Sequence, residues 1–235
     1  MIAVSLEARA PGGIGQIGNR AGAYPTGMFT PNGCPVPDVE ALEQVGVGHR
    51  LPMPISDAFV AEILKPYRTH AKYLKSAEIT QFSETAMQHS TADESIVTGT
   101  GRFSIPESCY IDDTGHFNAV EFNICYNQLA YVVFGKCVEA GLMHRLWRVN
   151  VAVPSFAEYK RHQLPAMLIV RVDGVRFFKP MKSDDFRGEL SIDRMTLLGQ
   201  AGFFFTSITF SDSEGVKAKG NVVLAFQPDL TPLTN

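Results

Sequence analysis

The sequence predicts an α+β fold in which a curled antiparallel sheet wraps around one long central helix. Two observations carry this prediction. Residues 119–137 are apolar nearly all round, which is typical of a helix that is buried on every side. Segments with the alternation of strands lie both before and after this helix, so strands from both halves of the chain are expected to share one sheet around it.

The remaining elements follow in chain order. A short helix begins at Ser56 or Asp57, both good N-cap residues, and ends at Pro66. A second small helix is expected over 155–163. Alternation and turn residues predict strands at 74–82, 94–103, 166–178, 187–199, 202–211 and 216–226, with a short extended piece at 106–111. Residues 211–215, SDSEG, have the composition of a hairpin turn.

Residues 1–55 differ from the rest of the chain. They hold 9 of the 20 Gly and 7 of the 14 Pro, which predicts an irregular arm ahead of a folded domain at 56–235. Residues 13–18 read GIGQIG, a literal GxGxxG. A dinucleotide site would need a helix directly after this motif, and Gly22 and Pro25 interrupt it, so we predict no such site.

Composition excludes several classes of protein. The net charge of −3 argues against a general nucleic-acid-binding protein, which normally carries a basic surplus. No apolar run is long enough to span a membrane, and the first residues do not read as a signal peptide, so a cytoplasmic location is expected. The four cysteines show neither metal-ligand spacing nor a disulfide framework, so no metal site is predicted.

The entrance to the central helix carries the candidate chemistry. Asn118, followed by Glu121 three residues later, fits an N-cap with a capping-box partner. The free N–H groups at such a helix start can polarise a thioester carbonyl and stabilise an enolate or a tetrahedral intermediate. Further along, Asn127 and Gln128 interrupt the apolar surface. Each is either a satisfied structural amide or a group that holds a ligand.

Three further side chains are candidates for proton transfer or hydrogen bonding. Tyr67 and Tyr110 could donate hydrogen bonds or relay protons. His116 precedes the helix, and histidine can exchange a proton near neutral pH. An ordinary loop histidine bonded to backbone explains His116 equally well.

The block GHFNAVEFNICYNQLAYVVF (115–134), with SCYIDDTGHF ahead of it, resembles the long-chain fatty acyl-CoA thioesterase family first described in mycobacteria. The similarity spans roughly residues 56–230. It implies the hot-dog fold, in which a curled antiparallel sheet wraps one long helix. The family's pocket residues are two tyrosines and two asparagines, and by motif these fall on Tyr67, Tyr110, Asn118 and Asn127.

The chain equally resembles enzymes of isonitrile-lipopeptide and β-amino-acid polyketide pathways. These add glycine to the β-carbon of a 2-enoyl thioester on an acyl carrier protein and give an N-carboxymethyl-3-aminoacyl thioester. Asn127 and Gln128 stand where hot-dog thioesterases usually keep an Asp or Glu nucleophile or base, which favours glycine addition. The resemblance implies no cofactor beyond the phosphopantetheine of the carrier protein or coenzyme A that carries the substrate.

In the mechanism expected from these residues, the acyl chain lies in an apolar tunnel and the thioester oxygen meets the helix start at Asn118. Tyr110 or His116 then protonates the α-carbon, with Gln128 among the substrate-binding residues. A cation is expected to hold the glycine carboxylate. The candidates are Arg68, His70, His162, Arg171 and Arg176.

Two alternatives stay open, thioester hydrolysis and a non-catalytic module that binds acyl thioesters. The expected partners are an acidic acyl carrier protein and a second copy of the chain. Basic clusters at 144–148 and 160–162 could dock the carrier protein, although a solvated charged edge explains them as well. The homodimer is implied by the resemblance, because hot-dog subunits pair their sheets.

Overall fold

The structure is a computed structural model that describes residues 51–83, 94–112, 116–143, 154–198 and 201–227. Its main feature is a seven-stranded antiparallel sheet in the order β1-β2-β3-β5-β6-β7-β4. The strands are β1 (Met53–Ile55), β2 (Leu74–Phe82), β3 (Val97–Phe103), β4 (Met167–Phe177), β5 (Phe186–Leu198), β6 (Ala201–Asp212) and β7 (Gly215–Phe226). The helices are α2 (Asp57–Ile63), the 3-10 turn η1 (Thr69–Ala71), α4 (Ala119–Glu139) and α6 (Phe156–Ala166).

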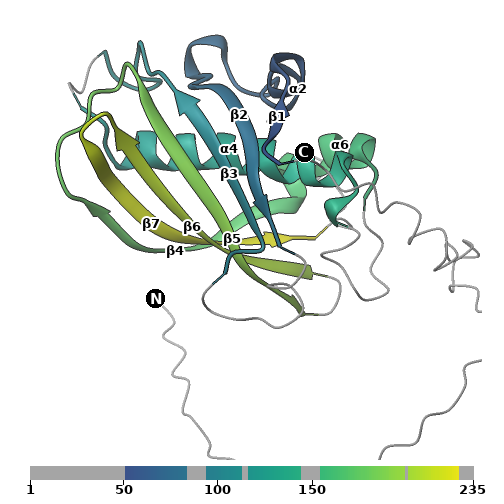
Figure 1. The fold of residues 1–235 in the computed structure, drawn as a ribbon. Helices are drawn as coiled ribbons and strands as arrows, with labels where there is room; N and C mark the ends of the chain where they lie inside the picture. The colour runs from purple at the N-terminus through teal and green to yellow at the C-terminus, as the bar shows by residue number, and fades with distance from the viewer. Residues whose placement is uncertain (1–50, 84–93, 113–115, 144–153, 199–200, 228–235) are drawn as a thin grey trace, which may run out of the picture. The chain divides into compact units, whose positions relative to one another are not determined.

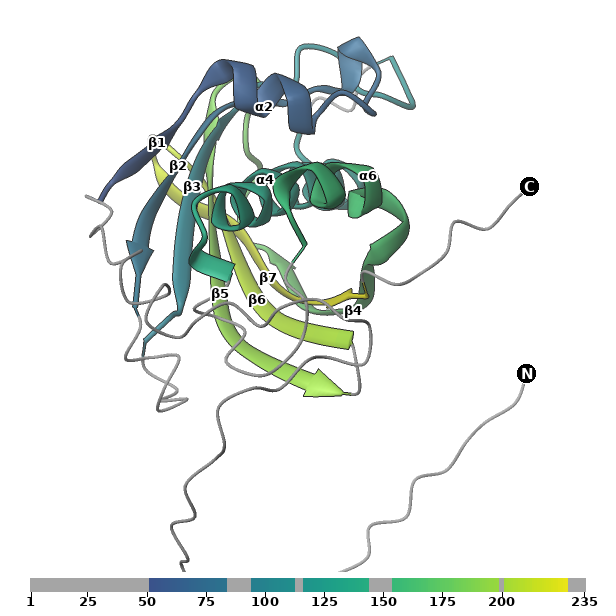
Figure 2. The same cartoon turned by 90° about the vertical axis from the view of Figure 1, so that its right-hand side faces the viewer.

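The sheet curls around α4, which runs across its concave face (Figure 1). Seen from the side, β1 lies at one margin of the curl and β4 at the other, while α6 lies beside α4 and α2 covers it from above (Figure 2). A curled antiparallel sheet around one long helix is the hot-dog fold. The prediction of an α+β fold of this kind is therefore confirmed.

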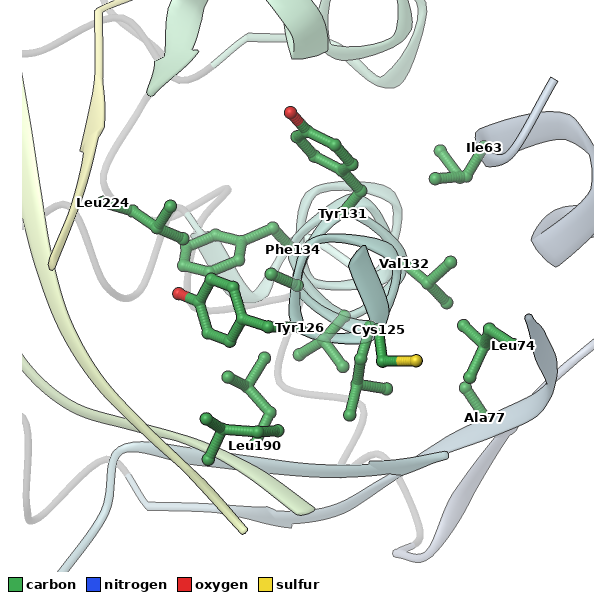
Figure 3. Close-up of a cluster of buried hydrophobic side chains, with 14 of the residues drawn as sticks. Ile63, Leu74, Ala77, Cys125, Tyr126, Tyr131, Val132, Phe134, Leu190 and Leu224 are labelled. Carbon is green, nitrogen blue, oxygen red and sulfur yellow. The ribbon is translucent and has the colours of Figure 1, made fainter. Parts of the chain in front are cut away.

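Helix α4 is held by apolar contacts on almost every side. Figure 3 shows side chains from the sheet, such as Leu74 and Leu190, and Ile63 of α2 surrounding the helix. Glycine lets the helix lie close to β3, because a Cβ on Gly99 would clash with the side chain of Val133 on α4. A side chain at this position would require the helix or Val133 to shift.

A cluster of phenylalanine rings anchors the start of α4. The rings of Phe117 and Phe122 lie 5.0 Å and 5.2 Å from the ring of Phe210 on β6. Phe186 on β5 lies 5.1 Å from Phe117. These are the separations at which aromatic pairs contribute beyond the area they bury. The N-terminus of α4 is therefore fixed against the sheet, which positions the residues that precede it.

Most elements predicted from sequence are present, within three residues at their ends. The prediction of an extended piece at 106–111 is wrong, because these residues form bends and irregular backbone between β3 and α4. The short elements β1 and η1 were not predicted, since three residues show no periodicity. β1 lies within the stretch assigned to the arm, so folded structure starts before residue 56. The GxGxxG stretch at 13–18 lies outside the described residues.

Candidate functional site at the start of helix α4

Asn118 caps α4 and also contacts the loop before it. Its Oδ1 accepts a hydrogen bond from the Val120 backbone N–H at 2.8 Å, so the prediction of an N-cap is confirmed. Its Nδ2 donates to the hydroxyl oxygen of Tyr110 at 2.7 Å. Because that oxygen acts as the acceptor, the hydroxyl hydrogen of Tyr110 stays available for another acceptor. Tyr110 is 47% exposed, so a substrate can reach it from solvent.

Glu121 has a different environment from the one predicted, and the capping-box prediction is wrong. Its carboxylate accepts a hydrogen bond from Ser108 Oγ at 3.0 Å instead of reaching back to the backbone of Asn118. The reason is its position, because the side chain points into the protein and is only 2% exposed. Among the described residues, its Oε2 has no hydrogen-bond partner and no basic side chain forms an ion pair with it.

A buried carboxylate oxygen without a partner is unfavourable. An unsatisfied buried polar atom costs about 1–3 kcal/mol, and more when the group is charged. The start of a helix offsets part of this, since its dipole favours a negative side chain in the first turn, where Glu121 lies. Proteins retain buried polar atoms without a partner, and the free energy that their burial costs, mainly at functional sites.

A cavity of about 350 Å³ lies against this carboxylate. Its lining is mostly polar and comes from the 105–112 loop, the start of α4 and the loop before β5. The lining residues are Ile105, Pro106, Glu107, Ser108, Asp112, His116, Glu121, Ser183 and Asp184. The structure thus brings predicted His116 together with Glu121 in an acidic cavity. The predicted apolar tunnel for the acyl chain stays a prediction.

Two buried groups near Glu121 are poor proton acceptors. Burial, followed by the nearby carboxylate of Glu121, holds the pKa of the Cys125 thiol well above its ordinary value. Burial, followed by the neighbouring Cys109, raises the pKa of the Tyr73 hydroxyl. Both groups therefore keep their protons at neutral pH, and neither can serve as a base there.

Tyr67, between α2 and η1, and Asn127, on α4, lie outside the cavity lining. Tyr67 is near Cys125 and Tyr131, and burial raises the pKa of its hydroxyl, so it can donate a hydrogen bond but keeps its proton. Asn127 is half-buried, and its side-chain amide makes no hydrogen bond to the described residues. Asn127 lies nine positions after Asn118, roughly 13 Å further along the helix axis. Neither residue lines the acidic cavity among the described residues.

The three residues predicted to bind substrate, Gln128, His162 and Arg171, do not line the acidic cavity. Gln128 is fully buried, where its Oε1 accepts from the backbone N–H groups of Tyr73 and Leu74 at 2.9 Å and its Nε2 donates to Ala71 O at 2.6 Å. The structure therefore gives Gln128 a structural role in place of substrate binding, because a side chain with no exposed surface cannot reach a ligand in this conformation.

His162 and Arg171 are likewise placed away from the cavity lining. His162 is half-buried on α6, and its Nδ1 has no partner among the described residues. Arg171 lies on the edge strand β4 and pairs with Asp173 at 2.5 Å. Neither residue lines the cavity, so neither of them supplies a cation for the glycine carboxylate at this site.

Sequence reasoning missed Ser108 and treated Glu121 as a cap. One signal was available, since a glutamate inside an otherwise apolar helix is expected to be buried along with its neighbours.

Of the basic clusters, 144–148 lies outside the described residues, and Lys160 pairs with Glu62 at 2.9 Å. The described part of the chain contains no group of three or more His, Cys, Asp or Glu side chains placed to hold a metal ion. None of the described helices is long and apolar enough to cross a membrane.

Comparison with known proteins identifies two enzymes to which this chain is similar in sequence. The chain is 37% identical over 177 residues to a (2E)-enoyl-[ACP] glycyltransferase of Streptomyces coeruleorubidus, covering 72% of this chain and 96% of that protein. It is 33% identical over 179 residues to the (2E)-enoyl-[ACP] glycyltransferase of Mycobacterium tuberculosis, covering 74% and 87%. A putative thioesterase from Syntrophus aciditrophicus, a solved structure, has a TM-score of 0.40 and 12% identity over 72% of this chain and 94% of that one. The pattern that defines the FcoT-like thioesterase domain matches residues 62–226, so this chain belongs to the family of FcoT-like thioesterase domains.

Proposed function

We propose that this protein adds glycine to the β-carbon of a 2-enoyl thioester carried by an acyl carrier protein. The observation that carries the proposal is the similarity to the two (2E)-enoyl-[ACP] glycyltransferases, which extends over almost the whole length of the one from Streptomyces. The local geometry agrees with it, because Asn118 and Tyr110 present hydrogen-bond donors at the start of a buried helix.

The thioester oxygen is proposed to lie between the Tyr110 hydroxyl and the first turn of α4. A donor there makes the β-carbon more electrophilic and stabilises the enolate that forms when an amine attacks it. Asn118 holds Tyr110 in place through the hydrogen bond of 2.7 Å. Tyr67 and Asn127 are proposed to contact the acyl or pantetheine part of the substrate further along α4.

The product is an N-carboxymethyl-3-aminoacyl thioester, so the thioester bond survives the reaction. We retain the proposals that the substrate's own phosphopantetheine is the only prosthetic group needed, that an acidic acyl carrier protein delivers it, and that the reaction takes place in the cytoplasm. We also propose a homodimer. Its support is the edge strand β4, whose Leu168, Val170 and Val172 are 40–51% exposed and could be covered by a second copy.

Hydrolysis of an acyl thioester is the second candidate function, and one observation favours it. The sequence offered no carboxylate base, but the structure places Glu121 on the wall of a cavity next to the helix start. A carboxylate in that position can activate water as well as an amine. The two functions differ in whether the thioester is broken.

The experiment that separates them follows free thiol and enoyl absorbance together. Purified protein is mixed with a medium-chain 2-enoyl thioester, with and without glycine. Glycine addition removes the enoyl absorbance only when glycine is present and releases no thiol. Release of thiol at the same rate with and without glycine would overturn the proposal in favour of hydrolysis.

A further inference from the structure

We propose that residues 65–75, here called the basic segment, form the surface on which the acyl carrier protein docks. The inference rests on the proposed function and adds to it the place where the partner that delivers the substrate binds. It starts from an uneven distribution of charge. The chain has a net charge of −3, yet the basic segment, KPYRTHAKYLK, holds four Lys or Arg residues and one His and no acidic residue.

The charges of the basic segment are accessible and are not neutralised by nearby carboxylates. Its five basic side chains are all exposed, except for the half-buried Lys72. None of the five forms an ion pair with a carboxylate of the described residues. Glu62, three residues before Lys65, pairs with Lys160 of α6 at 2.9 Å. The basic segment can therefore offer its charges to an acidic partner.

Buried hydrogen bonds hold the backbone of the basic segment against the central helix. The segment runs from the end of α2 through η1 into β2 (Figure 2). Gln128 of α4 accepts from the N–H groups of Tyr73 and Leu74 at 2.9 Å and donates to Ala71 O at 2.6 Å. Because this backbone is fixed, a partner that binds the basic side chains takes up a defined position relative to α4, and little ordering is needed on binding.

The basic segment adjoins both parts of the proposed substrate site. The backbone N–H of Ser104 donates to Tyr73 O at 3.0 Å, so the segment lies beside the start of the 105–112 loop, which carries Tyr110. Within the segment, Tyr67 packs against the buried core. A carrier protein on this surface is therefore next to the residues proposed to contact the thioester and the pantetheine.

The surrounding charges direct an acidic partner to this side of the loop. The cavity formed by the 105–112 loop is lined by the carboxylates of Glu107, Asp112 and Asp184. These carboxylates repel an acidic protein, whereas the basic segment attracts it. An acyl carrier protein presents acidic side chains together with the phosphate of its prosthetic group, so both of its anionic features suit the basic segment.

The composition of the basic segment favours a protein partner over a lipid surface. Segments that bind anionic membranes combine basic side chains with large exposed apolar ones, which enter the bilayer. Among the described residues, none of the large apolar side chains that are exposed lies between positions 65 and 75.

The test reverses two charges and compares two thioesters of the same enoyl acid in the full-length protein. The variant is Lys65→Glu with Lys75→Glu, and the substrates are a 2-enoyl acyl carrier protein and 2-enoyl pantetheine, which has neither the protein nor the phosphate. We expect kcat/KM to fall roughly tenfold or more with the carrier protein and to change by less than about twofold with the pantetheine thioester. In the wild type, kcat/KM with the carrier protein should also fall as ionic strength rises, and the variant should lose most of this dependence.

Two controls separate the position of the charges from their number. Arg194→Glu with Lys219→Glu makes the same change in net charge at exposed side chains on β5 and β7, and it should keep both values of kcat/KM. Lys65→Arg with Lys75→Arg keeps the charge and should behave as wild type. Thermal unfolding should show that all the variants are folded.

Three results would overturn the docking surface. They are an unchanged kcat/KM for the carrier protein in the folded charge-reversal variant, an equal loss with both thioesters, and binding to vesicles of anionic phospholipid that the reversal abolishes while turnover of the carrier protein stays normal. Calorimetric titration with the carrier protein, in the absence of glycine, measures docking apart from chemistry. A wild-type protein that binds the carrier protein but forms no glycine adduct from either thioester would overturn the proposed function and leave the docking surface standing.

Discussion

The side-chain amide of Asn118 joins two parts of the site, because it caps α4 through Oδ1 and holds the Tyr110 hydroxyl through Nδ2 at 2.7 Å. The loop that carries Tyr110 is otherwise irregular and half-exposed. A hydrogen bond to the fixed end of a buried helix therefore gives this tyrosine a defined place. Substitutions of these two residues are therefore expected to affect catalytic activity and folding stability to different extents.

Tyr110→Phe should lower kcat for glycine addition by roughly 100-fold, as expected when one donor to a developing oxyanion is removed. The side chain is 47% exposed, so the free energy of unfolding should change by less than about 0.5 kcal/mol. The control is Tyr126→Phe, whose buried hydroxyl pairs with Thr206 at 2.8 Å. That variant should lose about 1 kcal/mol of stability and keep its activity. Full activity in Tyr110→Phe would remove this hydroxyl from the mechanism.

Asn118→Ser should keep the helix cap, because serine caps helices as well as asparagine, but it cannot donate to Tyr110 as the amide does. We expect wild-type stability and a decrease in kcat of roughly tenfold, since Tyr110 loses its anchor. Asn118→Ala should show the same loss of kcat and in addition lose about 1 kcal/mol of stability. Steady-state kinetics and urea unfolding measure the two effects. A fully active Asn118→Ser protein would mean that Asn118 is only a cap.

Gln128→Met should destabilise the fold without changing the chemistry. The substitution keeps the volume but leaves Ala71 O and the N–H groups of Tyr73 and Leu74 without their partner. Three buried unsatisfied groups correspond to roughly 3 kcal/mol or more of unfolding free energy. Urea unfolding gives this value, and kcat per folded molecule should stay near wild type. A stable but inactive variant would restore Gln128 as a substrate-binding residue.

Stability should decrease at alkaline pH because of buried thiols. Burial raises the pKa of Cys137 to about 12, whereas an unfolded cysteine titrates near about 8.5. The native state therefore holds this proton longer, so its stabilising contribution is complete below about 8.5 and disappears as pH rises toward about 12. The loss is at most about 1.4 kcal/mol per pH unit for one thiol.

Urea unfolding between pH 7 and 10 measures this dependence. Cys137→Ala should be less stable than wild type at pH 7, because it leaves a small cavity, but should lose less stability as the pH rises. An identical pH dependence in the two proteins would show that Cys137 does not contribute to alkaline unfolding.

The sequence predicted the sheet and the central helix because both have long, distinct patterns. The strands β5 to β7 alternate their apolar positions many times, and the 21 residues of α4 are apolar nearly all round. β1 has three residues, too few to show a period. The 106–111 segment looked extended by composition, but the phenylalanine cluster and the helix cap hold the chain around it in an irregular path.

Only part of the site could be predicted, because the sequence does not show which way a side chain points or which distant residues it meets. Asn118 follows from capping rules, and its link to Tyr110 joins residues only eight positions apart. The environment of Glu121 depends on which way its side chain points, and both a cap and a buried carboxylate bonded to Ser108 fit the same sequence. Gln128 was uncertain for the same reason, since its partners at 71–74 lie more than fifty residues away in the chain.

The central claim is that this protein joins glycine to an enoyl thioester without breaking the thioester. Intact-mass spectrometry of a 2-enoyl acyl carrier protein incubated with the enzyme and isotopically labelled glycine tests it most directly. The account predicts a carrier protein that is heavier by one labelled glycine and still carries the acyl chain. Appearance of the free carrier protein, at a rate that does not depend on glycine, would contradict it.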